Sequence, residues 1–244
     1  MEVSIGDLCK RLGVQEVSPS VFRETSQEWF GRASTEAKRF YEEGSRILIR
    51  CDVPYAEQAR LFDGHALVPT QKIAPVVCEK LAGIDSVLEL GFGTGFRLLY
   101  YALNWPNTKF LGIDSDEATL EVAKKRITAL GVQNVEVRKA DIFDLKLEEK
   151  FGSVLALDCW PKKALAETKV AFSLENLAHF ERMVDPAQRG AFITACYGKW
   201  TFRQIEAFQE VGRQTGLYSL KVVRCDYQKP EDPLREAVVI IASK

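Results

Sequence analysis

A glycine-rich turn inside an apolar stretch constrains the fold of this chain most strongly. The apolar run at residues 87–90 leads directly into Gly91-Phe92-Gly93-Thr94-Gly95, and apolar residues at helical spacing follow. This order predicts a strand, a tight turn and a helix, the unit that cradles a nucleotide-like cofactor. A second apolar run ends in Asp114, about twenty residues further on, where a carboxylate can reach ribose hydroxyls.

Strand and helix patterns alternate from residue 85 to the end of the chain, which predicts an α/β fold with a mostly parallel sheet. The last two strands are separated by a turn-rich segment rather than by a helix, so we expect an antiparallel pair at one edge. The expected strands cover residues 86–90, 109–113, 135–139, 153–157, 190–196, 218–226 and 236–242, and the expected helices cover 94–104, 116–130, 174–183 and 200–215.

The region before this unit has a different pattern. Apolar and aromatic stripes predict helices over residues 1–45, which either cover the sheet or form a lid over a substrate. Further expectations are a short strand at 46–53, a helical turn at 56–62, a turn at 63–65 and a helix over 71–81. We therefore divide the chain into an N-terminal helical cap, 1–68, and a cofactor-binding domain, 69–244.

The composition narrows the class of partner. The 244 residues are 46% apolar with a formal net charge of −1, which is typical of a soluble globular protein and lacks the basic excess of a broad nucleic-acid surface. Six cysteines are scattered singly, so we expect reduced thiols and no metal site. No apolar run approaches membrane-spanning length, and the beginning of the chain has no secretory pattern, so we expect a cytoplasmic protein with no membrane partner.

The spacing of the glycines argues against a dinucleotide site. In the pattern G-x-G-x-x-G the third glycine allows close helix packing, and that position is Phe96 in this chain. The pattern present is G-x-G-x-G, preceded by Glu89. With these residues the chain resembles the class I S-adenosylmethionine-dependent methyltransferases.

The resemblance covers residues from about 70 to the end and implies a set of cofactor contacts. In that family the segment matched by Glu89, Gly91, Gly93 and Gly95 wraps the methionine and ribose parts of S-adenosylmethionine. The acidic residue after the second strand, matched by Asp114, holds the ribose hydroxyls. The expected cofactor site comprises Glu89, Gly91, Phe92, Gly93, Thr94, Gly95, Asp114, Ser115, Asp158, and, at the adenine, Asp141 and Ile142. The implied fold is a Rossmann-like three-layer sandwich with a mostly parallel seven-stranded sheet and an antiparallel edge strand.

Catalytic candidates follow the fourth expected strand, at Asp158-Cys159-Trp160-Pro161. Asp158 is a candidate to orient the acceptor or take its proton, and Trp160 to form an apolar or cation-binding wall. The alternative is that Asp158 caps a turn and Trp160 packs against a helix. Methyltransferases acting on amide or exocyclic nitrogen often carry Asn-Pro-Pro and an aromatic residue at this point, so that substrate class is in doubt.

Three weaker candidates complete the site. His65 is a candidate general base because it precedes the helix near the expected pocket, although a structural histidine is the competing interpretation. Tyr197 follows the fifth expected strand and points toward the expected crevice. Cys159 is adjacent to the reaction centre but has no histidine partner nearby in the sequence.

The sequence thus predicts an S-adenosylmethionine-dependent methyltransferase. A small-molecule acceptor is favoured slightly, with RNA or protein acceptors as alternatives, and the oligomeric state is not predicted. A non-catalytic cofactor-binding protein and a transferase that moves a different group from an altered sulfonium cofactor are the competing hypotheses.

Overall fold

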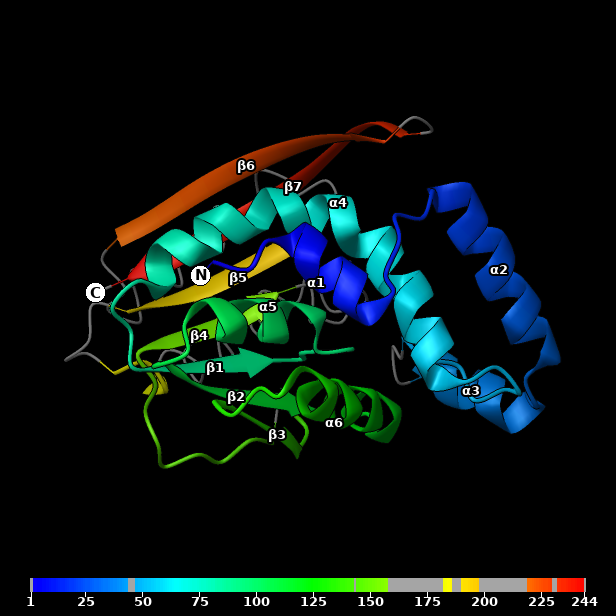
Figure 1. Ribbon diagram of the computed structural model, residues 1–244, viewed down its shortest axis with the longest axis horizontal. Coiled ribbons are helices and arrows are strands. Elements are labelled where there is room, and N and C mark those ends of the chain that lie inside the picture. The colour runs from blue at the N-terminus through cyan, green and yellow to red at the C-terminus, as the bar shows by residue number, and fades with distance from the viewer. Residues whose placement is uncertain are drawn as a thin grey trace.

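The computed structural model describes residues 2–43, 47–142, 144–157, 182–185, 190–197, 219–229 and 232–243, in which a single sheet has the strand order β3-β2-β1-β4-β5-β7-β6 (Figure 1). The strands are β1 Ser86–Leu90, β2 Lys109–Asp114, β3 Val135–Lys139, β4 Ser153–Leu157, β5 Ala191–Tyr197, β6 Ser219–Lys229 and β7 Asp232–Ser243. The helices are α1 Ile5–Leu12, α2 Pro19–Arg32, α3 Thr35–Glu43, α4 Tyr55–Leu81, α5 Phe96–Asn104 and α6 Glu117–Leu130.

The predicted Rossmann-like α/β fold is confirmed, with five neighbouring strands running parallel. After β5 the chain returns as a hairpin in which β7 pairs antiparallel with both β5 and β6. The reversed strand therefore lies one place inside the sheet and β6 forms its edge, which differs from the expected antiparallel edge strand. The helices expected over 174–183 and 200–215 fall outside the described residues, apart from 182–183.

The central strands are buried on both faces. Val87 packs toward α4, α5 and α6, whereas Leu88 and Leu90 pack on the opposite face with Phe151 and Phe192. A strand that is buried on both faces has a continuous run of apolar residues instead of alternating apolar and polar residues. β1 and β4 both have such a run. Glu89 is the charged residue in this run, and its side chain is completely buried.

Helix α4 is the main departure from the sequence-based prediction. Residues 55–81 form one continuous helix. The helical conformation expected at 56–62 and 71–81 is confirmed, but the turn expected at 63–65 and the separate start of a helix at 71 are wrong. Gly64 serves close packing: a Cβ there would lie 2.0 Å from the carbonyl oxygen of Gln15, and Gly64 accepts a hydrogen bond from the amide of Val17 at 3.1 Å. The helix continues across the boundary at 68/69, so the division of the chain into cap and domain stays a prediction.

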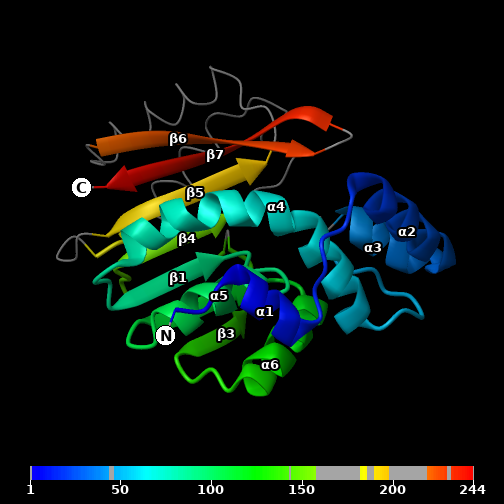
Figure 2. The same ribbon diagram turned by 45° about the horizontal axis from the view of Figure 1, so that its top comes forward.

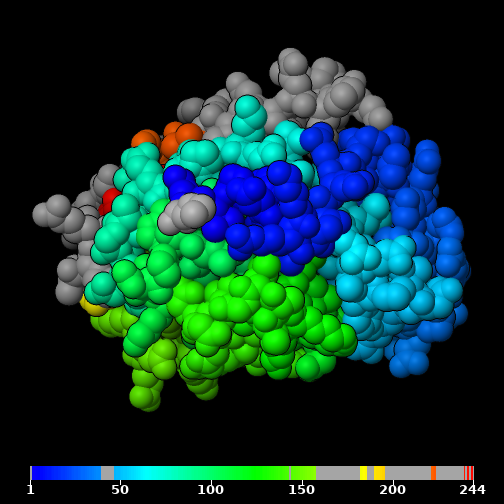
Figure 3. Space-filling view, viewed as in Figure 1, coloured from blue at the N-terminus to red at the C-terminus, as the bar shows by residue number. Residues whose placement is uncertain are grey.

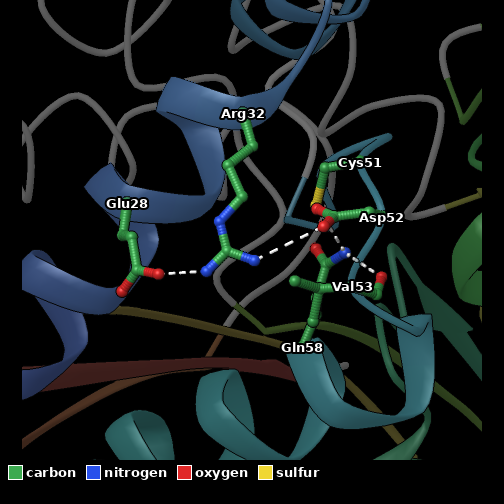
Figure 4. Close-up of polar contacts among 6 residues, drawn as sticks. All are labelled: Glu28, Arg32, Cys51, Asp52, Val53 and Gln58. Atoms are coloured by element: carbon green, nitrogen blue, oxygen red, sulfur yellow. Dashed lines mark hydrogen bonds and ion pairs between the residues drawn. The ribbon is translucent and has the colours of Figure 1, made fainter.

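The expected strand at 46–53 is also absent from its described part, 47–53. The side chain of Gln58 forms hydrogen bonds with this segment, in place of the hydrogen bonds that a neighbouring strand would make (Figure 4). The Gln58 amide accepts from the amide of Ile49 at 2.7 Å and donates to the carbonyl oxygens of Ile49 at 2.8 Å and Val53 at 2.9 Å. Arg32 of α2 pairs with Glu28 and reaches Asp52 at 3.5 Å. Segment 47–53 is thus fixed to the first turns of α4 by Gln58 and linked to α2 by Arg32.

Replacing Gln58 by Ala is expected to lower the free energy of unfolding by about 2 to 3 kcal/mol, because three buried backbone groups lose their partner. Urea unfolding would measure this loss, with Glu57→Ala, at an exposed position of the same helical turn, as control. Equal unfolding midpoints for the two variants would contradict this role of Gln58.

Helices α2 and α3 lie beyond the carboxyl ends of the parallel strands. The arrowheads of β1 and β5 point toward α2 and α3 in two views (Figures 1 and 2). The expected helices over 1–45 are present as α1, α2 and α3, and α1 covers the surface between α4 and the green region of α5 and α6 (Figure 3). No helix among the described residues is long and apolar enough to cross a membrane.

Candidate functional site

The glycine turn, residues 91–95, connects β1 to α5. Gly91, Gly93 and Gly95 have φ angles of 63°, 59° and 78°, a left-handed conformation that side chains disfavour. The amide of Gly91 donates to the carbonyl oxygen of Ile113 at 2.7 Å, and that of Gly93 donates to Asp114 Oδ2 at 2.9 Å. The turn is therefore tied to the end of β2, as the predicted cofactor unit requires.

Two glycines of the turn also allow close approach by other segments. A Cβ on Gly95 would lie 3.1 Å from the Cβ of Ala123, so α5 begins directly against α6. A Cβ on Gly93 would lie 3.1 Å from Cδ1 of Ile47. Ile47 consequently lies against the glycine turn.

Replacing Gly95 by Ala is expected to destabilise the protein by at least about 1 kcal/mol more than Gly131→Ala. Both glycines have left-handed backbone, at φ 78° and 65°, but a Cβ on Gly131 meets nothing within 4 Å. The difference in their free energies of unfolding, measured in denaturant, isolates the contact with Ala123. Equal losses would show that α6 does not constrain the turn.

A buried network that the sequence reasoning missed holds the middle of the turn. Thr94 Oγ1 donates to Asp63 Oδ1 at 2.5 Å, and Arg126 Nη2 lies 2.7 Å from Asp63 Oδ2. Arg126 Nη1 also donates to the carbonyl oxygen of Thr94 at 3.0 Å. Asp63 is 4% exposed; burial raises its pKa, while Arg126 and the Thr94 hydroxyl act in the opposite direction. No local pattern marks this network, because its members come from α4, the turn and α6.

Glu89 is a buried carboxyl at the start of the turn. Burial raises its pKa to about 7; Arg97 opposes this shift and Asp114 adds to it. Arg97 Nε lies 3.9 Å from Glu89 Oε1, and its Nη2 donates to the carbonyl oxygen of Leu157 at 2.6 Å. Among the described residues, neither oxygen of Glu89 has a hydrogen-bond partner. Arg97 therefore connects the ends of β1 and β4, through the ion pair with Glu89 and the hydrogen bond to Leu157.

The remaining polar candidates lie at the same edge of the sheet. Asp114 is half-buried at the end of β2, and its Oδ1 accepts the amide of Asp116 at 2.9 Å. Ser115 and Asp141 are exposed and Ile142 is buried, and the amide of the neighbouring Ala140 donates to the Asp114 carbonyl oxygen at 3.1 Å. Because β1, β2 and β3 are neighbours, the expected methionine, ribose and adenine contacts lie next to one another.

The side chains of two predicted cofactor contacts are directed elsewhere. Phe92 and Thr94 are 2% and 3% exposed, so their side chains face the interior. His65 lies within α4 rather than in a turn, and its ring stacks on Phe22 of α2 at 4.1 Å between centroids. This stacking matches the structural interpretation of His65.

The catalytic candidates lie mostly outside the described residues. These are Asp158, Trp160 and Cys159, together with the side chain of Tyr197, whose backbone forms the last residue of β5.

The described part of the chain has no cluster of three or more residues suited to a metal ion. A cavity of about 620 Å³ opens between α1, the start of α4 and α6, and its lining includes none of the predicted site residues.

Comparison with known proteins bears on the family of the chain. A family model described as a methyltransferase domain matches residues 84–210, more than half of the chain. The chain is 29% identical over 140 residues to a tRNA (guanine-N(7)-)-methyltransferase of Rhizobium johnstonii, a match that covers 54% of this chain and 58% of that relative. The chain thus spans little more than half the length of this relative.

Solved structures show the same fold at low sequence identity. An O-methyltransferase family protein from Burkholderia thailandensis matches 78% of this chain and 61% of its own, at 18% identity and a TM-score of 0.55. The N-terminal domain of EvdMO1, solved in the presence of SAH and D-fucose, matches 72% of this chain and 83% of its own, at 18% identity and a TM-score of 0.52. The matched family domain, with the glycine turn and its acidic neighbours, shows that the chain belongs to the class I S-adenosylmethionine-dependent methyltransferases.

Proposed function

We propose that this chain binds S-adenosylmethionine at the carboxyl ends of β1, β2 and β3 and transfers its methyl group to a small-molecule acceptor. Glu89 and the glycine turn would hold the methionine part, Asp114 and Ser115 the ribose, and Asp141 with Ile142 the adenine. The observation that carries the donor assignment is Glu89, whose two buried oxygens have no hydrogen-bond partner among the described residues. Ionising a buried carboxyl is costly, and a cationic ligand stabilises the ionised form because the ligand's charge offsets that cost.

When bound, S-adenosylmethionine supplies an electrophilic methyl group on a sulfonium. The chain must then align an acceptor atom with that group, keep water out, and take up a proton where the acceptor loses one. Arg97 fixes the end of β4 to the end of β1, which sets the position from which Asp158 follows. We propose that Asp158 orients the acceptor and accepts its proton, with Trp160 and Tyr197 as walls of the acceptor site.

A small acceptor is supported by the position of the cap. Helices α2 and α3 lie beyond the carboxyl ends of the strands, and Ile47 lies against the glycine turn. A site covered in this way suits an enclosed molecule, and the net charge of −1 provides no general attraction for nucleic acid. The tRNA-directed relative supports transfer RNA as the second candidate acceptor.

Methyl transfer from labelled S-adenosylmethionine tests this proposal. The protein is incubated with three fractions of a cell extract: the low-molecular-weight filtrate, bulk transfer RNA and the protein fraction. We expect label in the filtrate alone. Label in transfer RNA or in protein would replace the small-molecule acceptor with that class.

A further inference from the structure

We propose that Asp63 is a positioning residue for the cofactor: with Arg126 it holds Thr94, and through Thr94 the glycine turn, in the conformation that binds S-adenosylmethionine. This inference rests on the proposed function. It assigns a role in cofactor binding to the N-terminal half of α4, which precedes the segment matched by the family model.

The glycine turn needs such a support because its own sequence is flexible. Three of its five residues are glycines, which lose more conformational freedom on ordering than any other residue. If the turn were free, the binding of a ligand would have to order it at the expense of affinity. In the structure Gly91 and Gly93 are held by β2, and Gly95 donates to the carbonyl oxygen of Phe92 at 3.1 Å. Among the described residues of the turn, Thr94 is the one whose side chain donates a hydrogen bond, and its acceptor is Asp63.

The network binds Thr94 at two points. Its hydroxyl donates to Asp63 at 2.5 Å and its carbonyl oxygen accepts from Arg126 at 3.0 Å, while the acid and the guanidinium are 2.7 Å apart. The hydroxyl and the carbonyl oxygen of Thr94 are therefore fixed relative to each other. This restricts the rotation of the peptide groups on either side of Thr94. Those peptide groups belong to Gly93 and Gly95, the predicted cofactor contacts.

Stability alone does not account for this arrangement. Removing two charges from water is costly, and buried ion pairs can often be replaced by apolar residues without loss of stability. Asp63 and Arg126 are 4% and 8% exposed, so the pair bears that cost. Its placement around the glycine turn gives it a role in binding.

The test compares cofactor affinity in the full-length protein and its variants by calorimetry with S-adenosylmethionine and S-adenosylhomocysteine. Thr94→Val keeps the shape of the side chain but removes the hydroxyl, and we expect both dissociation constants to rise about tenfold, the equivalent of one net hydrogen bond. Thr94→Ser restores the hydroxyl and should return both constants to near the wild-type values. Thr128→Val, which removes an exposed threonine hydroxyl of α6, is the matched control and should bind as the wild type does.

Asp63→Asn is expected to weaken binding at least as much as Thr94→Val, and the double variant no more than the stronger single variant, because both changes break the same contact. If Asp63→Asn does not fold, the Thr94 pair decides, because Thr94→Val leaves the ion pair in place. Wild-type affinity in a folded Thr94→Val variant, or equal weakening by Thr94→Ser, would overturn the inference. A failure of the wild-type protein to bind either ligand would instead overturn the proposed function.

Discussion

An Asp114→Ala variant is expected to bind S-adenosylmethionine about 100-fold more weakly than the wild type. We propose that the carboxylate receives two ribose hydroxyls, and two hydrogen bonds to a charged group at about 1.5 kcal/mol each correspond to this factor. The same side chain accepts the amides of Gly93 and Asp116 at 2.9 Å, so its removal also loosens the glycine turn. Calorimetric titration of the folded variant would measure the change.

Two further substitutions make the Asp114 result specific. Glu79→Ala removes an exposed carboxylate near the end of α4, so it changes the net charge equally at a position outside the proposed site. We expect this control to bind normally and Asp114→Asn to fall between the wild type and Asp114→Ala, because an amide retains one acceptor oxygen. Equal affinity of Asp114→Ala and Glu79→Ala would remove Asp114 from the ribose site.

The largest effect on stability is expected at Gly190, which directly precedes β5. A Cβ at this position would lie 1.2 Å from the carbonyl oxygen of Gly152, the residue before β4. Backbone atoms cannot yield as a flexible side chain does, so β4 and β5 would have to separate at their amino ends. We expect Gly190→Ala to lose about 3 kcal/mol or more of unfolding free energy, or to fail to fold.

Gly31→Ala is the matched control for this change. Gly31 lies within α2, and a Cβ there meets nothing within 4 Å. Alanine favours a helix over glycine by about 0.5 to 1 kcal/mol, so this variant should be equal to or slightly more stable than the wild type. Chemical unfolding of both variants gives the comparison, and similar midpoints would contradict the tight approach of Gly190 to Gly152.

The sequence was sufficient where structure depends on local pattern. β1, the glycine turn and β2 follow from an apolar run, glycines that need left-handed backbone, and an acidic residue at the strand end. Their order along the chain also placed Glu89 and Asp114 together, because neighbouring parallel strands end at the same edge. The placement of these proposed cofactor residues at one edge of the sheet could therefore be predicted from the sequence.

Long-range packing could not be predicted from the sequence in the same way. The sequence predicts a turn at 63–65, but α4 continues through these residues, and Gly64 serves there for close contact with Gln15. Gln58 replaces a strand partner for segment 47–53, and no local pattern distinguishes it from a surface glutamine. Asp63 and Arg126 meet only after α4 and α6 pack against the turn.

Calorimetric titration of the wild-type protein with S-adenosylmethionine tests the central claim most directly. The account predicts saturable binding at one site, competition by S-adenosylhomocysteine, and no binding of NAD, because the G-x-G-x-G turn and Glu89 suit a sulfonium nucleoside rather than a dinucleotide. Absence of any S-adenosylmethionine binding by the folded protein, or tighter binding of NAD, would contradict it.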